Sequence, residues 1–432
     1  MLGANGKSDR GMSRPADQEV RRRRVFYIPG YDPIHPRRYR ELYRKEGTLQ
    51  SKISGYEIHL VGRPGGSGYG WRVTSTQDGA TTEAEFDVLV WSDIVRRSMD
   101  HGILRTYAIM ARTAWVYIST GALARLMRLR KGPVIAALYP VGMLILQAIA
   151  AVAAGLLVAL VATWAMGWFG AFWMGGEPRA PGTKQWIAAG LLGVLGALAV
   201  LRHFRNVDNR LYVYYLMHDY AYSAATRGAN PPELEARIAQ FATRIADALE
   251  TEADEVLVVG HSSGAHLAVS VLADLHREGR IPATGPKLAF LALGQVVPMV
   301  SFLPDAHRLR ADLAHLAAAD IPWIDVTAPG DGCAFALCDP VSVSGVAPAN
   351  KRWPLVLSAA FTQTLSPERW KSLRWRFFRL HFQYLCAFDR PGDYDYFRIT
   401  AGPVALATRY KDRAPSASRI ERPVSGYTGT AR

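Results

Sequence analysis

Short hydrophobic runs in both halves of this 432-residue chain predict buried strands. The runs are rich in β-branched, leucine and aromatic side chains and stand at 25–28, 256–259, 288–293 and 322–327. Stretches with helical spacing of apolar residues alternate with the later runs, at 234–249, 265–272 and 306–319. Because strands alternate with helices, we expect an α/β fold with a mostly parallel sheet.

The segment between the first strand and the later ones has a different pattern. A polar helix is expected over 36–46, followed by β-rich or alternating stretches at 56–61, 70–75 and 84–90. Gln77-Asp78-Gly79 separates the last two stretches and has the composition of a hairpin turn. This part of the chain is therefore expected to add β-hairpins to the sheet.

The longest hydrophobic stretch has no formal charge from residue 132 to residue 176. Its central part, roughly 141–164, is long enough to cross the ~30 Å hydrocarbon layer as a helix. A shorter candidate span follows at 186–201, and the connection between the two contains clustered tryptophan and phenylalanine. Gly190, Gly193 and Gly196 would allow the two helices to approach closely. We expect a transmembrane two-helix hairpin; the alternative is a buried helical hairpin in a soluble protein.

Basic residues flank this hairpin on both outer sides. Arg125, Arg128, Arg130 and Lys131 precede it, and Arg202, Arg205 and Arg210 follow it, whereas the connection has only Arg179 and Lys184 against Glu177. Because cytoplasmic flanks of membrane helices are rich in lysine and arginine, both termini and the folded domain are expected in the cytoplasm. The predicted location is the inner (cytoplasmic) membrane.

Residues 103–129 mix arginine with tryptophan, tyrosine, leucine and methionine. A helix with this composition would be amphipathic and could lie in the membrane interface. The alternative is an ordinary helix packed on the folded domain, and the sequence favours neither.

Net charge modifies this picture only slightly. Lysine and arginine exceed aspartate and glutamate by 14, with clusters at Arg21 to Arg24 and between Arg96 and Lys131. Basic residues beside a membrane segment indicate anionic lipid rather than nucleic acid, for which we find no recognition motif. The 3 cysteines show no zinc or disulfide spacing, which favours reduced thiols.

The candidate chemistry is concentrated at Gly260-His261-Ser262-Ser263-Gly264, directly after the strand at 256–259. A Gly-x-Ser-x-Gly segment between a strand and a helix can form a tight turn that holds the serine hydroxyl clear of the backbone. Gly260 and Gly264 are expected because a Cβ at either position would collide where strand and helix meet. Ser262 is therefore the candidate nucleophile.

A serine hydroxyl needs a base, and imidazole needs a carboxylate that fixes its tautomer. Asp331 follows the strand at 322–327 and is the preferred acid, with Asp325 and Asp339 as rivals. His381 is the preferred base because it follows the acid and no histidine comes later. The alternative histidines are His261, His266, His307 and His315.

The developing oxyanion needs fixed donors. One would be the backbone N–H of Ser263, and the second would be the backbone N–H of Tyr31 in the turn Pro29-Gly30-Tyr31. A plain strand-ending turn is the competing interpretation of the second segment.

The order Ser262…Asp331…His381, the Gly-His-Ser-x-Gly turn and the upstream Pro-Gly turn resemble the α/β-hydrolase superfamily. The resemblance covers about 25–31 and 230–384, and it implies a twisted, mostly parallel sheet with helices on both faces and a triad at the carboxyl edge. It also implies ester hydrolysis through an acyl-enzyme. This chain departs from the usual pattern because its oxyanion turn follows the first strand, whereas several strands normally precede it.

The resulting organisation is a disordered basic tail (1–23), the N-terminal part of the hydrolase domain with β-hairpins and a juxtamembrane helix (24–131), the hairpin (132–205), the main catalytic part (206–412) and a second disordered tail (413–432). We expect a membrane-anchored serine esterase or lipase acting on an acyl ester or lipid. An acyltransferase with the same triad and a non-catalytic interaction protein are the alternatives. The expected partners are the substrate and a bilayer with anionic lipids; no cofactor, metal or nucleic acid is expected.

Overall fold

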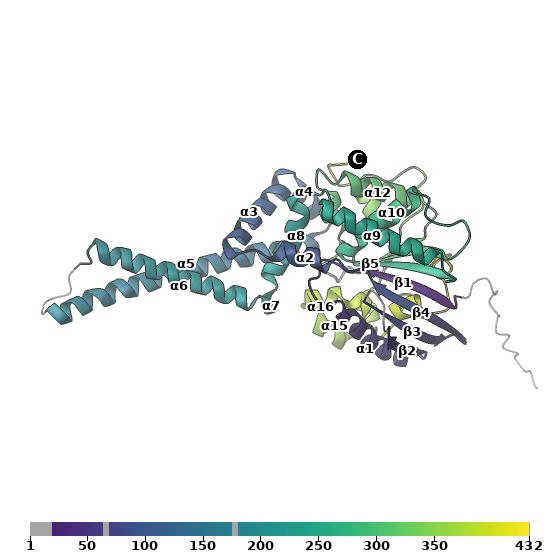
Figure 1. The fold of residues 1–432 in the computed structure, drawn as a ribbon, viewed down its shortest axis with the longest axis horizontal. Helices are drawn as coiled ribbons and strands as arrows, with labels where there is room; N and C mark the ends of the chain where they lie inside the picture. The colour runs from purple at the N-terminus through teal and green to yellow at the C-terminus, as the bar shows by residue number, and fades with distance from the viewer. Residues whose placement is uncertain (1–19, 64–68, 175–179, 432) are drawn as a thin grey trace, which may run out of the picture.

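A twisted eight-stranded sheet with helices on both faces forms the folded domain (Figure 1). The computed structural model describes residues 20–63, 69–174 and 180–431. The strand order is β2-β3-β4-β1-β5-β6-β7-β8, and neighbouring strands from β4 to β8 run parallel. The predicted α/β fold with a mostly parallel sheet is therefore confirmed.

The strands largely follow the hydrophobic pattern of the sequence. Their bounds are β1 (Arg22–Ile28), β2 (Glu57–Gly62), β3 (Tyr69–Gln77), β4 (Ala80–Val88), β5 (Glu255–His261), β6 (Lys287–Leu293), β7 (Trp323–Thr327) and β8 (Leu355–Ser358). The predicted turn between β3 and β4 is confirmed, since Asp78 and Gly79 both have positive φ and Gln77 pairs with Ala80. The short edge strand β8 was not predicted.

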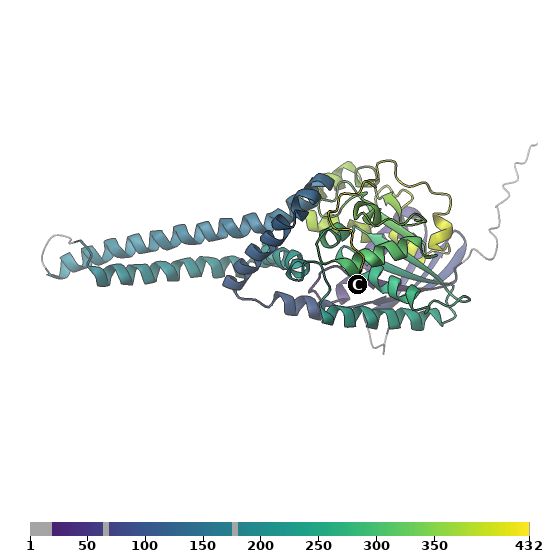
Figure 2. The ribbon, with the colours of Figure 1, turned by 90° about the horizontal axis from the view of Figure 1, so that it is seen from above.

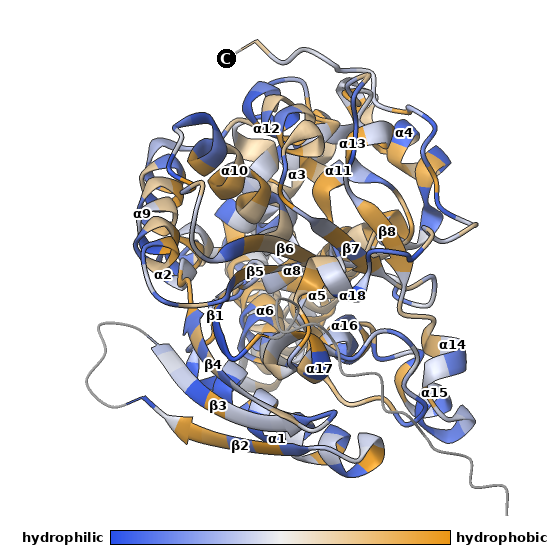
Figure 3. Ribbon diagram, turned by 90° about the vertical axis from the view of Figure 1, so that its right-hand side faces the viewer, coloured by the Kyte–Doolittle hydropathy of each residue, from blue (hydrophilic) through white to orange (hydrophobic). Residues whose placement is uncertain are grey.

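Alternate residues of the central strands face opposite sides of the sheet and pack into two separate hydrophobic cores. Val256 and Val258 of β5 pack with α2 (Ser92–Met99), α9 (Pro232–Leu249), α10 (Ser263–Arg277) and α12 (His307–Ala318). Leu257 and Val259 face α1 (Arg37–Ser54), α16 (Phe377–His381) and α17 (Tyr396–Ala401). Figure 3 shows the hydrophobic central strands between these layers and the more hydrophilic β3 and β4.

Shorter helical segments complete the domain. They are α11 (Val297–Ser301), α13 (Pro340–Val343), α14 (Phe361–Thr364), α15 (Pro367–Leu373), the 3₁₀ turn Gln383–Leu385 and α18 (Leu406–Arg409).

Two long antiparallel helices, α5 (Lys131–Met174) and α6 (Thr183–Asn206), project from the domain (Figure 2). Both are long and apolar enough to cross a membrane. They touch at Gly155 and Gly193, where a Cβ on either glycine would lie 2.7 Å from the carbonyl oxygen of the other. Of the predicted close-approach glycines, Gly193 makes backbone contact, Gly196 lies against Val158, and Gly190 has open space around it.

The basic, aromatic segment at 103–129 forms α3 (Ile103–Ser119) and α4 (Ala122–Leu129). One face is buried against the domain, where Tyr117 and Leu126 pack with Phe302. The opposite face exposes Leu104 and Trp115, which are 78% and 69% exposed. Packing on the domain is thus confirmed for one face only, and the other face exposes apolar side chains beside Arg105 and Arg112.

After the hairpin, α7 (Asp208–Leu211) leads into α8 (Val213–Ala225). Met217 and Val213 of α8 form a small core with Leu144 of α5. The chain thus passes from the second long helix straight into a helix that packs on the domain (Figure 1).

The predicted disordered tail at 1–23 is wrong for its last residues, while 1–19 lie outside the described residues. Strand β1 begins at Arg22, and Arg23 is buried against Glu255, with a 2.6 Å Nε to Oε2 distance. Arg24 pairs with Glu85 and Asp87. Arg23 and Arg24 are therefore neutralised within the sheet, and Arg22 pairs with the exposed Glu252.

The predicted disordered tail at 413–432 is also wrong for residues 413–431. The Ile420 N–H donates to Leu337 O, and Val424 N–H donates to Val343 O. Tyr427 donates its hydroxyl to Thr120 O at the end of α3. Backbone hydrogen bonds hold this Pro-, Ser- and Gly-rich segment without regular helix or strand, which is why its composition resembled disorder.

Candidate active site

Ser262 stands at the tight turn between β5 and α10. Its φ and ψ angles are 57° and −123°, a strained combination for a residue with a side chain. A Cβ on Gly264 would lie 2.0 Å from Ile28 O, and one on Gly260 would lie 2.7 Å from Ala265 Cα. The glycines are therefore required sterically, as the sequence predicted.

The Pro29-Gly30-Tyr31 turn lies beside Ser262 because β1 pairs with β5, and Ile28 is opposite Gly260. A Cβ on Gly30 would lie 3.3 Å from Ser262 Oγ. In the described part of the chain, no backbone acceptor is recorded for the N–H groups of Tyr31 and Ser263. Ser263 also opens α10, so the positive end of that helix dipole is directed at the serine.

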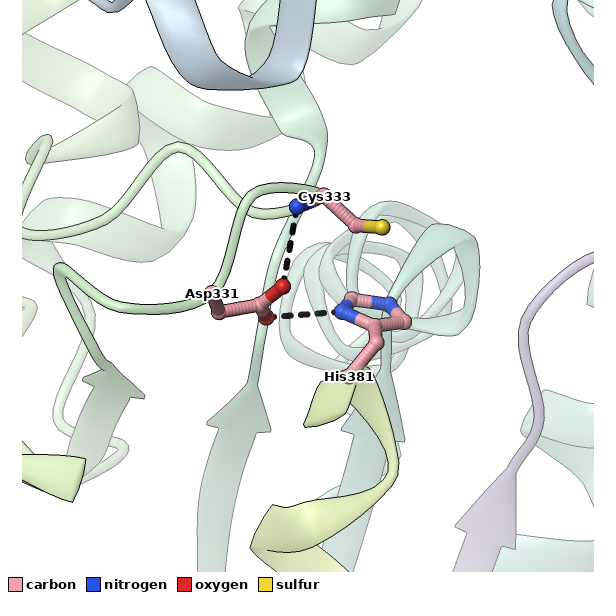
Figure 4. A group of neighbouring side chains, drawn as sticks. All are labelled: Asp331, Cys333 and His381. Carbon is pink, nitrogen blue, oxygen red and sulfur yellow. Dashed lines mark hydrogen bonds and ion pairs between the residues drawn. The ribbon is translucent and has the colours of Figure 1, made fainter. Parts of the chain in front are cut away.

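Asp331 and His381 are hydrogen-bonded, as Figure 4 shows. His381 Nδ1 lies 2.7 Å from Asp331 Oδ2, and because an ionised carboxylate only accepts, the imidazole donates. Tyr384 donates its hydroxyl to the same oxygen at 3.0 Å, and the Cys333 N–H donates to Oδ1 at 2.9 Å. The carboxylate is therefore held by two side chains and one backbone group.

These contacts keep Asp331 ionised. Burial on its own would raise the pKa of this carboxyl, but His381 and the hydrogen bonds from His381, Cys333 and Tyr384 outweigh it and lower the pKa. A carboxylate that stays charged can fix the imidazole tautomer with Nε2 free to accept a proton.

The rival acids have other surroundings. Asp325 is fully buried within β7, and burial raises its pKa well above the usual range. Asp339 caps α13 by accepting from Val341 N and Ser342 N, and it pairs with Lys351. Neither has a recorded contact with His381 among the described residues.

The rival histidines are also placed elsewhere. His261 donates from Nε2 to the His381 carbonyl oxygen, and burial lowers its pKa to about 3. Burial lowers the pKa of His266 to about 4. His315 bonds to His276, and His307 lies beside Gly429 O. His381 is thus the histidine that the structure brings to Asp331.

Ser262 and His381 line the same cavity, together with Tyr31 and Ser263. His381 Nε2 is buried and has no hydrogen-bond partner among the described residues. No hydrogen bond joins it to Ser262 Oγ in the described structure, so the contact between Asp331 and His381 is formed and the one between Ser262 and His381 is open. Such contacts often tighten only when substrate binds.

The cavity offers about 80 Å³ to the centres of water-sized molecules, which is room for several waters. Two residues of this site were not predicted from the sequence. Tyr384 follows His381 by three positions, a spacing that places both on one side of a helical turn. Asp219 of α8 lines the cavity and had no sequence pattern to mark it.

Asp331, Cys333 and His381 also place a carboxylate oxygen, a thiol and an imidazole nitrogen within 4.8 Å of one another. This set fits a metal poorly, because burial raises the pKa of the Cys333 thiol, whereas a metal needs the thiolate. Ligation through His381 Nδ1 would also break its bond to Asp331.

In comparisons with known proteins, no family model, no curated protein and no solved structure matches this chain.

Proposed function

We propose that this protein is a serine hydrolase that cleaves carboxylic esters through an acyl-enzyme. The observation that carries the proposal is a serine in a strained strand-to-helix turn that shares a cavity with an Asp-bonded histidine. In this proposal the nucleophile is Ser262 in the turn after β5, the base is His381 at the end of α16, and the orienting acid is Asp331 in the loop after β7.

In the proposed reaction, Ser262 Oγ attacks the ester carbonyl carbon while His381 Nε2 takes the hydroxyl proton. The carbonyl oxygen becomes an oxyanion that the N–H groups of Ser263 and Tyr31 stabilise. Collapse breaks the bond to the alcohol, which leaves with the proton from His381. Water then repeats the sequence on the acyl-enzyme, releasing the carboxylic acid and restoring Ser262.

We further propose that α5 and α6 anchor the enzyme in a membrane. Their apolar side chains are largely uncovered: Leu156 and Leu195 are 67% and 61% exposed. A continuous apolar surface of this kind is costly in water and is stable in lipid. The 44 residues of α5 form a helix about 66 Å long, so only part of it crosses the ~30 Å hydrocarbon layer.

The test is labelling with a fluorophosphonate, which reacts only with an activated serine. The wild-type protein should label, and Ser262→Ala should not, at equal protein level. Ser372→Ala, which removes an exposed serine outside the cavity, is the matched control and should label like the wild type. Absence of labelling in the wild type would refute the proposal.

Turnover supplies the second measurement. A series of nitrophenyl esters of increasing acyl length should be hydrolysed, and Asp331→Asn should lower kcat by about 10,000-fold because the imidazole loses its tautomer control. Equal rates in wild type and Asp331→Asn would contradict the assigned role of Asp331.

A further inference from the structure

Asp219 is an acid in the wall of the active-site cavity that the proposed hydrolysis does not use. It lies on α8, on the side of the cavity formed by the segment that follows the long helices. The proposed chemistry already has its carboxylate in Asp331. A second carboxyl in the same cavity therefore needs its own explanation.

Asp219 has no recorded hydrogen bond or salt bridge among the described residues. Burial raises the pKa of its carboxyl to about 7, and nearby His381 opposes this only in part. Asp219 is partly exposed, and a cation bound in the cavity would stabilise its ionised carboxylate. The open side of Asp219 is the cavity itself.

The cavity wall around Asp219 is rich in aromatic rings: Tyr31, Tyr117, Tyr215, Tyr220, Phe378 and Phe382. Several hydroxyls of these tyrosines are engaged elsewhere. Tyr31 bonds to Ser98, Tyr117 donates to Met299 O, and Tyr215 donates to Tyr31 O. These tyrosines therefore contribute ring surface, and aromatic ring faces attract cations.

The charged side chains of the cavity wall also favour a cationic ligand. No lysine or arginine is among the described residues of the wall. The other acid, Asp32, is paired with Arg38 at 3.2 Å and also accepts from Tyr39. His261 and His266 are neutral at pH 7 because burial lowers their pKa. Asp219 is thus the acid of the wall without an ion-pair partner among the described residues, and a bound cation would favour its ionised form.

We propose that Asp219 and the surrounding rings bind an ammonium group, so that the ester cleaved at Ser262 has an ammonium-bearing alcohol part. This inference rests on the proposed function and names its substrate class. The ammonium can come from a soluble amino-alcohol ester or from a lipid head group.

The first experiment measures binding without turnover. Phenyltrimethylammonium should slow fluorophosphonate labelling of Ser262 in the full-length protein, whereas its neutral isostere tert-butylbenzene should not. Asp219→Asn should lose at least tenfold of the protective affinity. Asp247→Asn, the same change at an exposed position on α9, is the control and should retain it.

The second experiment compares kcat/KM for butyrylthiocholine with kcat/KM for its neutral isostere, 3,3-dimethylbutyl thiobutyrate. The wild-type ratio should be at least ten, and Asp219→Asn should bring it close to one. Lysophosphatidylcholine and lysophosphatidylglycerol in mixed micelles distinguish the two sources of the ammonium group. If the protein prefers the choline lipid but does not prefer butyrylthiocholine over its neutral isostere, the ammonium belongs to a lipid head group.

The outcomes separate this inference from the proposed function. If the wild type labels with fluorophosphonate but shows no ammonium protection and a ratio of one, the inference fails and the hydrolase stands. If Asp219→Asn slows both esters equally, Asp219 acts through His381 and the inference fails as well. If the wild type does not label, the proposed function fails first.

Discussion

At the residue scale, the orientation of His381 depends on hydrogen bonds that meet at Asp331. Tyr384 donates to the carboxylate that orients His381, and its hydroxyl in turn accepts from Ala328 N. Ser262 and Asp331 were predicted because each follows a strand, whereas His381 was predicted from its place in the chain order, after the acid and with no later histidine. Asp219 was not, because nothing near it in the sequence indicates that α8 would line the cavity of a serine far along the chain.

His266 gives a prediction about acid stability. Burial lowers its pKa to about 4, whereas an unfolded histidine titrates near 6.5. Below pH 6.5 the unfolded chain binds a proton that the folded protein does not, so the free energy of unfolding falls as pH falls towards 4. The contribution is of the order of 3 kcal/mol when complete.

We therefore expect His266→Gln to lose less stability between pH 7 and pH 5 than the wild type, by roughly 2 kcal/mol in urea unfolding. His59→Gln, at an exposed position of β2, is the control and should follow the wild type. If the free energy of unfolding falls equally with pH in the wild type and in His266→Gln, the His266 imidazole does not cause the loss of stability in acid.

Gly264 gives a prediction about packing. In Gly264→Ala the new methyl group would overlap Ile28 O, a backbone atom of a central strand that cannot move alone. The unfolding temperature should fall by at least several degrees. Gly392→Ala, whose Cβ would meet Thr364 Cγ2 at an ordinary 3.6 Å, should change it little. Equal unfolding temperatures would refute the close approach of β1 and α10.

At the scale of elements, the long helices are held together by small residues rather than by large side chains. In Gly193→Val the side chain would meet Gly155 O and Ala159, so α5 and α6 should separate. Nitroxides at positions 156 and 195 in a cysteine-free background should report a distance larger by a few Å. Gly190→Val, three positions earlier with open space around it, should leave the distance unchanged.

The sequence predicted elements best where one pattern dominated. Continuous apolar runs indicated the central strands, and uncharged length indicated α5 and α6. Residues 413–431 were misjudged because their order comes from hydrogen bonds to Leu337 and Val343, far away in the chain. Strand β8 was missed because its apolar run, Leu355 to Leu357, has only three residues, fewer than the runs at 25–28 and 256–259.

At the scale of the molecule, the proposed anchor fixes on which side of the membrane the domain lies. Because basic residues flank both outer ends of the hairpin, positions 182 and 425 should lie on opposite sides. In intact cells an impermeant maleimide should label Gly182→Cys but not Ser425→Cys, and permeabilisation should expose the latter. Labelling of both before permeabilisation would contradict this topology.

The continuity of α6, α7 and α8 links the long helices to the cavity. Asp219 is only 13 residues beyond the end of α6 at Asn206, whereas Ser262 belongs to the central sheet. Hydrophobic mismatch tilts membrane helices when the bilayer becomes thinner. A tilt of α6 would therefore shift the wall of the cavity while leaving the nucleophile in place, and lipid thickness would tune substrate preference before it altered the intrinsic reactivity of the serine.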